Sequence, residues 1–214
     1  MQPSISSATA AIPLPVLVMA AGASRRMGRP KQLLPLGSGT VLTTVIDTLL
    51  AADCNPVVCV LGASSTQVAA ALVGWSVETV YNPDWDTGEM LSSVQCGLRH
   101  LSQLETHPGC LIALGDQPGL TAATVRALVG TVAHDPHRIV FCSHGMRRHH
   151  PIYLPASLWL RICELPVAST LRAVTGDPQL PVAYVNVDSF NDFRDLDTPE
   201  QYDSYRAQAM SDTG

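Results

Sequence analysis

The amino-acid sequence predicts an α/β fold in which helices cover both faces of a largely parallel sheet. Short apolar runs, of which Leu14–Met19 and Val57–Leu61 are the clearest, are typical of strands that are buried on both faces. Segments with a helical pattern, such as Thr40–Ala52, lie between these runs. Because strands and helices alternate along the chain, we expect right-handed crossovers between parallel strands.

The same reasoning assigns the remaining elements in order. Further strands are expected at Val77–Tyr81, Cys110–Leu114 and Arg138–Cys142, and further helices at Ser64–Leu72, Met90–Leu104 and Ala122–Val132. After Ser143 the alternation is less regular, and we expect a strand at Pro151–Leu154, short helices at Leu158–Glu164 and Ser169–Val174, and a strand at Val182–Val187. The last helix is expected to begin after Thr198, a good capping residue, with Pro199 in its first position.

Length and composition exclude several classes of protein. The chain has 214 residues, of which 46% are hydrophobic, and a net charge of −5, which is unlike a disordered chain. The apolar stretch Val16–Ala23 is too short to span a membrane. A secretory leader would have a Lys or Arg before its apolar stretch, but none precedes Arg25. The negative charge disfavours a nucleic-acid partner. We therefore expect one cytoplasmic domain over residues 13–210, after a disordered tail at 1–12, with no membrane partner.

The six cysteines fit a reducing compartment. No two of them have the C-x2-C spacing, and several, such as Cys59, lie inside apolar runs, where a cysteine behaves as a small hydrophobic residue. We expect neither a disulfide framework nor a zinc site. Trp75, Trp85 and Trp159 are expected to be packing residues.

The long loop after the first strand is the strongest functional signal. It runs from Ala20 to Lys31, the only lysine of the chain, and combines Arg25 and Arg26 with small residues whose backbone N–H groups can approach an anion closely. In an open α/β sheet this loop lies where ligands bind. It indicates a triphosphate site, although it matches neither G-x-G-x-x-G nor the P-loop pattern. The alternative is a surface loop with solvated arginines.

Asp116 is the second signal. It follows a buried strand, so its carboxylate is expected at the same edge of the sheet as the loop, where it could bind Mg²⁺. The alternative is an aspartate that only forms the turn. More acidic residues lie near the C-terminus, and most are expected to be solvated: Asp188, Asp192, Asp195, Asp197, Glu200 and Asp203. A two-carboxylate metal site would exist only if the fold brings Asp195 or Asp197 beside Asp116.

Six segments, taken together and in order, match one known family. They are Met19–Leu36, Asn82–Trp85, Gly88 with Leu91–Val94, Leu114–Pro118, His150–Pro151 and Asp195–Glu200. The chain thus resembles the MobA-like nucleotidyltransferases, in particular the molybdenum cofactor cytidylyltransferases. The resemblance implies a Rossmann-like three-layer α/β/α sandwich with a mostly parallel sheet, of the nucleotide-diphospho-sugar transferase type. It also implies transfer of a nucleotide from an NTP to a phosphorylated acceptor, with Mg²⁺ as cofactor and pyrophosphate as the second product.

The resemblance places the nucleotide in the N-terminal half and the acceptor in the C-terminal half. By position, the glycine loop (residues 20–28) would bind the nucleotide through Ala20, Ala21, Gly22, Ser24, Arg25 and Gly28. Arg26 and Lys31 would neutralise the phosphates during catalysis. Asp116 would hold Mg²⁺, with Asp197 or Asp195 as the second carboxylate. The base and ribose would face Leu91, Ser92 and Ser93, and the acceptor would face His150.

The leading hypothesis is transfer of CMP from CTP to molybdopterin, a phosphorylated pterin, with a client molybdoenzyme as a further partner. Ala21 favours CTP, because guanylyltransferase relatives tend to have a second glycine there. The alternatives are GTP as donor, another phosphorylated acceptor, or a non-catalytic accessory protein that binds the molybdenum cofactor.

Two departures from the family pattern fall in the acceptor half. His149 stands where relatives usually have Gly, and Pro178–Gln179 where they have Gly followed by Arg. The histidines at 144, 149 and 150 could alternatively suggest a metal site, but they lack a clear carboxylate or Cys partner. We expect His150 to line the acceptor pocket and His144 and His149 to be exposed.

Overall fold

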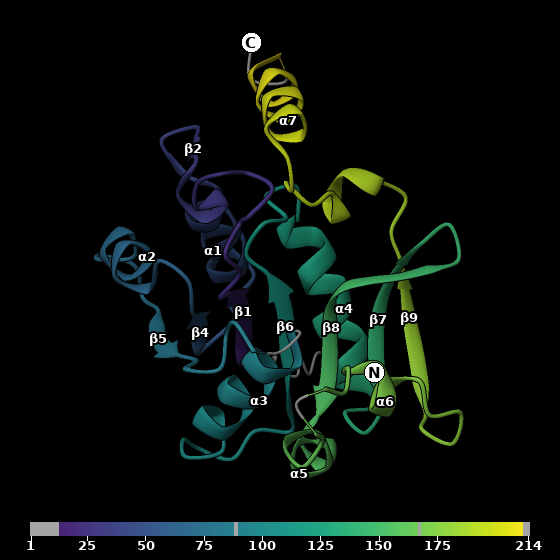
Figure 1. Cartoon of the computed structure of the whole chain (residues 1–214). Helices are drawn as coiled ribbons and strands as arrows, with labels where there is room; N and C mark the ends of the chain where they lie inside the picture. The colour runs from purple at the N-terminus through teal and green to yellow at the C-terminus, as the bar shows by residue number, and fades with distance from the viewer. Residues whose placement is uncertain (1–12, 88–89, 167, 212–214) are drawn as a thin grey trace, which may run out of the picture.

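The computed structural model describes residues 13–87, 90–166 and 168–211, and the predicted tail at 1–12 lies outside them. The strands of its main sheet are β1 (Val16–Ala20), β4 (Val57–Leu61), β5 (Glu78–Tyr81), β6 (Gly109–Leu114), β7 (Ile139–His144), β8 (Arg147–Pro155) and β9 (Val182–Asn186). Within the described residues the sheet has seven strands in the order β5-β4-β1-β6-β8-β7-β9 (Figure 1). Only the pairs β6–β8 and β8–β7 are antiparallel, so the prediction of a mostly parallel sheet is confirmed.

Helices cover both faces of this sheet. They are α1 (Val41–Ala51), α2 (Ser65–Ala71), α3 (Met90–Leu101), α4 (Ala122–His134), α5 (Trp159–Cys163), α6 (Arg172–Thr175) and α7 (Pro199–Ser211). Buried residues of α1, α2 and α4 pack on one face, and those of α3, α5 and α6 on the other. The three-layer α/β/α architecture is therefore confirmed, although α3 ends at Leu101 rather than Leu104.

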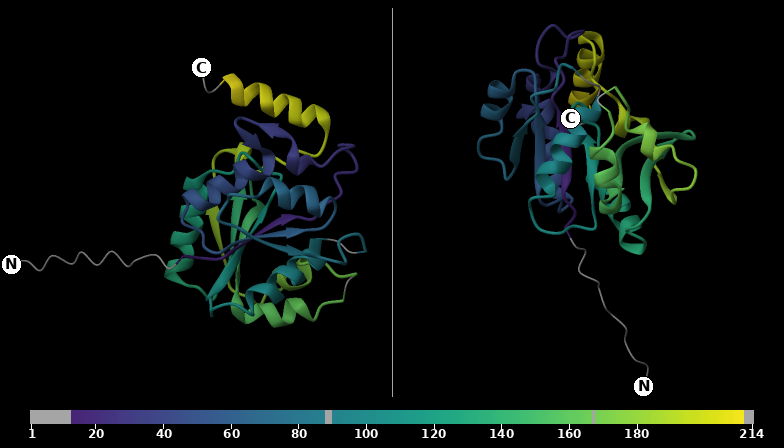
Figure 2. Two further views of the ribbon diagram at one scale, coloured as in Figure 1. Left: turned by 90° about the vertical axis from the view of Figure 1, so that its left-hand side faces the viewer. Right: turned by 60° about the horizontal axis from the view of Figure 1, so that its bottom comes forward.

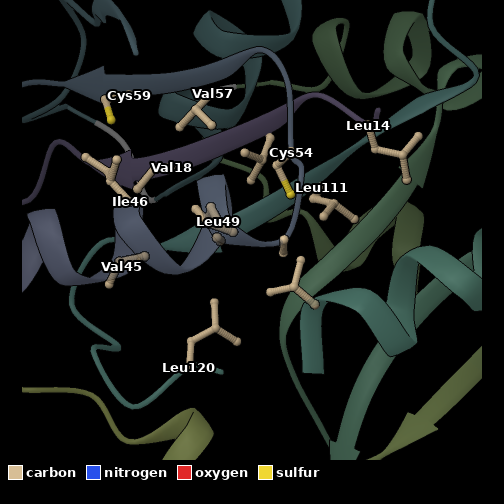
Figure 3. Packing of buried hydrophobic residues seen from close by; sticks show 14 of the residues in the cluster. Leu14, Val18, Val45, Ile46, Leu49, Cys54, Val57, Cys59, Leu111 and Leu120 are labelled. Carbon is tan, nitrogen blue, oxygen red and sulfur yellow. The ribbon is translucent and has the colours of Figure 1, made fainter. Parts of the chain in front are cut away.

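The alternation of side chains along β1 explains why its sequence is a continuous apolar run. Val16 and Val18 belong to the cluster beneath α1 and α4, part of which Figure 3 shows, whereas Leu17 belongs to the cluster beneath α3. A strand with a helix on each side needs apolar residues at every position. At the start of α1, Thr40 and Thr43 exchange side-chain and backbone hydrogen bonds in a capping box, which fixes where the helix begins.

Strand β8 is longer than the sequence indicated and runs against its neighbours. The sequence predicts a strand only at Pro151–Leu154. In the structure β8 pairs back to β7 through a two-residue turn at Gly145 and Met146, whose φ angles are +54° and +65°. Two successive positive φ angles are typical of a type I′ hairpin. This hairpin brings residues 147–150 into the sheet.

A third apolar cluster ties the glycine loop to the C-terminal segment. Met27 packs with Leu196 and Tyr202, together with residues of a short hairpin formed by β2 (Pro35–Leu36) and β3 (Gly39–Thr40). Helix α7 lies beside this hairpin (Figure 2), and the Tyr202 hydroxyl donates to the Pro35 carbonyl oxygen at 2.5 Å. The cluster thereby fixes residues 195–197 close to the loop after β1.

Two further observations concern residues outside the site. All six cysteines are free thiols, and four of them are buried. Among the described helices, none has the length and apolar character needed to cross a membrane.

Candidate active site

The loop that follows β1 is folded around one buried side chain, Gln32, in the short 3-10 helix η1 (Lys31–Leu33). Its Nε2 donates to the carbonyl oxygens of Ala20 and Gly22, each at 3.2 Å, and its Oε1 accepts from the Ser24 hydroxyl at 3.3 Å. A buried amide that joins both ends of a loop holds it in one conformation. No role is predicted from the sequence for Gln32, although it directly follows Lys31 in the family signature.

Within the loop, backbone conformation separates anchored from exposed residues. Ser24 and Gly28 have φ angles of +52° and +70°, and the backbone N–H groups of Met27 and Gly28 both donate to the Ser24 carbonyl oxygen. The Met27 side chain is buried, whereas Arg25 and Arg26 are exposed. The loop thus presents its arginines to solvent at the edge of the sheet, as a phosphate-binding loop requires.

Lys31 brings two distant carboxylates together. Its Nζ donates to Asp116 Oδ2 and, at 2.7 Å, to Asp197 Oδ1. Arg26 Nη2 donates to the other oxygen of Asp197, also at 2.7 Å. The backbone helps to hold this arrangement, since Leu196 N–H donates to the Asp116 carbonyl oxygen at 3.1 Å. The condition stated for a two-carboxylate site is therefore met geometrically.

The opposite charges of Lys31 and its two aspartate partners stabilise each other. Burial lowers the pKa of Lys31, but attraction to Asp116 and Asp197 outweighs burial, so the pKa lies above its ordinary value. Burial likewise raises the pKa of Asp197, but Lys31 and Arg26 outweigh it and hold that pKa below its usual range. The ammonium and this carboxylate are therefore both charged at neutral pH.

Asp195 lies in the same group but has a different partner. Its Oδ1 accepts from Gln117 Nε2 at 2.8 Å. Burial, followed by repulsion from Asp116, raises the pKa of Asp195. All three aspartates thus converge at the carboxyl edge of β1 and β6, with Asp197 engaged by cations and Asp195 by an amide.

A cavity of about 350 Å³ opens beside this group. Its lining includes Ala21 and Gly22 of the glycine loop, Lys31 and Gln32, Asp116 and Asp195, Ser93 of α3, and Trp85. Trp85, which is expected to be a packing residue, thus also lines this cavity. Ser92 and Ser93 each accept a hydrogen bond from Asn82 Nδ2, at 3.0 and 3.1 Å, which fixes the start of α3 at the cavity.

The side chains here fit a hard divalent cation. Carboxylate oxygens are the ligands that Mg²⁺ and Mn²⁺ prefer, and the Lys31 ammonium already lies at a point that Asp116 and Asp197 share. Among the described residues, no three His, Cys, Asp or Glu side chains form a ready-made metal site. A metal bound here would therefore need further oxygen ligands, such as phosphate or water.

A second, larger cavity of about 680 Å³ adjoins the first, and Met90 lines both. His150 and Leu91 line this larger cavity, whereas Ser93, with which Leu91 was expected to face the base, lines the smaller one. The His150 Nε2 atom is buried and has no hydrogen-bond partner within the described structure. Burial, with a smaller contribution from His149, lowers the pKa of His150 to about 4, so its ring is neutral at pH 7.

Two expectations about histidines were wrong. His149 is not exposed: its ring stacks on Phe193 with 4.4 Å between centroids, and its Nε2 is buried. His144 is not exposed either: it is half-buried, and its Nδ1 lies 2.9 Å from the Val187 carbonyl oxygen.

The expectation for Asp192 was also wrong. Asp192 is not solvated: it is 4% exposed and accepts hydrogen bonds from Thr121 at 3.0 Å and Thr124 at 2.6 Å. All three corrections follow from the segment after β9 folding over α4 and β8, which no local pattern indicates.

Comparison with known protein families identifies the domain type of this chain. The sequence matches the MobA-like NTP transferase domain over residues 16–182. The chain belongs to this family of nucleotidyltransferases. The resemblance inferred from the six segments is therefore confirmed.

Individual relatives are distant but cover most of the chain. Nicotine blue oxidoreductase from Paenarthrobacter nicotinovorans is 36% identical over 168 residues, which are 75% of this chain and 77% of that protein. Molybdenum cofactor cytidylyltransferase from Escherichia coli is 26% identical over 189 residues, 87% and 92% of the two chains. The structure of Rv0371c from Mycobacterium tuberculosis has a TM-score of 0.76 and 27% identity, covering 92% and 99%. Rv0371c is also known in complex with manganese.

Proposed function

We propose that this protein is a Mg²⁺-dependent cytidylyltransferase that transfers CMP from CTP to molybdopterin and releases pyrophosphate. The observation that carries the proposal is the contact of Lys31 with Asp116 and Asp197 beside the loop that follows β1. This group combines a fixed cation with carboxylates at the edge of the sheet where nucleotides bind. The relative from Escherichia coli, whose name states this activity, supports the choice of substrates.

In this mechanism the glycine loop binds the triphosphate and the cations neutralise it. Backbone N–H groups of the loop that make no hydrogen bond within it would face the phosphates, and Arg26 and Lys31 would provide positive charge. Asp116, with Asp197 or Asp195, would hold Mg²⁺, which when bound neutralises charge on the phosphate oxygens. The manganese complex of Rv0371c supports a divalent metal in such proteins.

The reaction forms one bond and breaks one bond at the α-phosphorus. A phosphate oxygen of the acceptor attacks the α-phosphorus, and the bond to the bridging oxygen of the β-phosphate breaks, so pyrophosphate leaves with the electron pair. The nucleophile is already an anion, so no strong base is required. The residues mainly position the reactants and stabilise charge, which dominate transfers of this type. Lys31 suits this task because its contacts can follow the negative charge as it moves to the leaving group.

The two adjoining cavities divide donor and acceptor. The smaller cavity, with Ala21 and Ser93 in its lining, would take the nucleotide, and Ser92 would support Ser93. The larger cavity would take the acceptor, and the buried, unpartnered Nε2 of His150 would make a hydrogen bond to it. The protein would act in the cytoplasm and pass its product to a client molybdoenzyme.

Turnover of each of the four NTPs with molybdopterin, scored by pyrophosphate release, tests the proposal. CTP should give the highest kcat/KM, because Ala21 replaces the second glycine of guanylyl-transferring relatives. A higher kcat/KM with GTP would contradict the choice of base but not the reaction. Turnover only with another phosphorylated acceptor would contradict the pterin, and binding of CTP without any turnover would support the accessory-protein alternative.

An oxidoreductase activity is a second candidate, which the name of the relative from Paenarthrobacter nicotinovorans favours. A second assay, run beside the measurement of pyrophosphate release, separates the two activities. Oxidation of added NADH or NADPH by an electron acceptor, without pyrophosphate release from any NTP, would support the oxidoreductase.

A further inference from the structure

The larger cavity has cationic side chains in its lining. Arg148 of β8 and Arg172 of α6 line it beside apolar residues such as Phe141 and Leu171, and no Asp or Glu does so within the described residues. The chain as a whole has 18 acidic residues against 13 Lys and Arg. A cationic cavity in an acidic protein favours a negatively charged occupant.

Arg148 is held in one position by its neighbours. The guanidinium carbon lies 4.4 Å from the centroid of the Phe141 ring, a cation–π contact. Its Nε and Nη2 donate to the Tyr184 hydroxyl at 3.0 and 2.7 Å, and its Nη1 donates to the Thr175 carbonyl oxygen at 3.1 Å. A cation already ordered in this way loses little conformational entropy when it binds a ligand.

The positive charge of Arg148 is not neutralised by a carboxylate. Arg26, Arg138 and Arg161 each pair with an aspartate, but Arg148 forms no ion pair within the part of the chain that the structure describes. A guanidinium has five N–H donors, and the three hydrogen bonds above use three of them. One donor on Nη1 and one on Nη2 remain for a ligand.

We propose that Arg148 makes the larger cavity an anion-binding subsite. The molecule that fills it has a flat or apolar body, which packs against apolar lining residues such as Leu171, and an anionic group, which binds Arg148. Arg172 adds to the positive potential. The proposal deepens the proposed function and rests on it in one respect, that this molecule is the acceptor. Because Arg148 does not line the smaller cavity, the anionic group is distinct from the acceptor phosphate that reacts there.

The test uses two dyes with similar aromatic bodies, of which only one is charged. Anilinonaphthalene sulfonate is an anion, and N-phenylnaphthylamine lacks the sulfonate. The Kd of each is measured by fluorescence titration of the whole protein, with folding checked by circular dichroism. We expect the wild-type protein to bind the anionic dye about tenfold more tightly or better, since hydrogen bonds to a charged group are strong. Added salt should weaken binding of the anionic dye only.

Variants assign this preference to one residue. Arg148→Met and Arg148→Gln should remove most of the preference and leave the Kd of the neutral dye unchanged, whereas Arg138→Met, on a distant surface ion pair, should keep it. Lys31→Met should also keep the preference, because Lys31 does not line the larger cavity. Since dye binding requires no turnover, the subsite is tested separately from nucleotidyl transfer. Equal affinity of the wild-type protein for both dyes would overturn the proposal. So would an unchanged preference in both Arg148 variants.

Discussion

Lys31 Nζ lies 2.7 Å from Asp197 Oδ1, although the two residues are 166 positions apart in the sequence. The contact exists because α7 and the β2–β3 hairpin pack together through Tyr202 and so place the preceding segment beside the loop after β1. The same lysine reaches Asp116 at the end of β6. Three separate parts of the chain thus supply one charged group.

The variant Lys31→Ala should lower kcat/KM by about 10²–10³-fold, equivalent to roughly 2–4 kcal/mol of transition-state stabilisation. The reason is the loss of a cation that would neutralise charge as pyrophosphate leaves. Pyrophosphate release under steady-state conditions measures the effect. Arg138→Ala, on a surface ion pair, is the control and should leave the rate unchanged. A loss of less than about threefold for Lys31→Ala would mean that this lysine is only a structural partner of the two aspartates.

The variants Asp116→Asn and Asp197→Asn should nearly abolish turnover while the protein remains folded. Both carboxylates face the Lys31 ammonium rather than the core, so their neutral analogues remove charge with little loss of packing. Asp188→Asn, on the exposed part of the acidic stretch, should have no effect on kcat. Similar small effects of all three substitutions on kcat would contradict a metal site at Asp116.

For Asp192→Asn we expect a lower stability rather than a lower rate. The carboxylate is buried and accepts hydrogen bonds from two threonine hydroxyls, one of them on the capping residue of α4. A neutral amide weakens these bonds, which should cost about 1–3 kcal/mol of unfolding free energy. Urea unfolding of the variant and the wild-type protein measures this difference. An unchanged unfolding midpoint would show that the segment after β9 is not held through this contact.

Replacing His150 by Ala should raise the KM of the acceptor and leave the Kd of the nucleotide nearly unchanged. The ring lines the larger cavity and not the smaller one. Equilibrium binding of CTP and steady-state kinetics with varied acceptor measure the two quantities separately. Equal losses in both would indicate damage to the fold, or that the two cavities do not divide donor from acceptor.

His150 should also make the protein less stable at acid pH. Its folded-state pKa is about 4, whereas an unfolded histidine has a pKa of about 6.5, so the unfolded chain takes up the proton first. Its contribution is complete above about pH 6.5 and is lost as the pH falls towards 4, by about 3 kcal/mol in total. Between pH 7 and pH 4 the unfolding free energy of the wild-type protein should therefore fall by about 3 kcal/mol more than that of His150→Gln. The same pH dependence in both proteins would contradict a neutral, buried His150.

Much of the fold follows from the sequence alone, because buried parallel strands leave a strong apolar signal. The run Val57–Leu61 is β4 without any change of bounds. Strand β8 was underestimated because Arg147–His150 are polar, and its pairing depends on the turn at Gly145 and Met146. The alternation of polar and apolar residues within one segment does not determine which strand it pairs with or in which register.

The candidate site could be predicted from the sequence only where it depends on the order of parallel strands. The position of Asp116 relative to the loop follows from the parallel order of β1 and β6. The approach of Asp197 could be stated only as a condition, since it depends on how α7 packs. Arg148 was missed, because its role depends on Tyr184 and Thr175, which approach it only in the folded chain.

The fate of two labelled phosphates distinguishes transfer of CMP from every alternative to it. The protein is incubated with Mg²⁺, molybdopterin and CTP labelled at either the α- or the γ-phosphate, and the products are separated. We expect the α-label in the acceptor product and the γ-label only in pyrophosphate. Transfer of the γ-label to the acceptor, or retention of both labels in intact CTP, would contradict transfer of CMP.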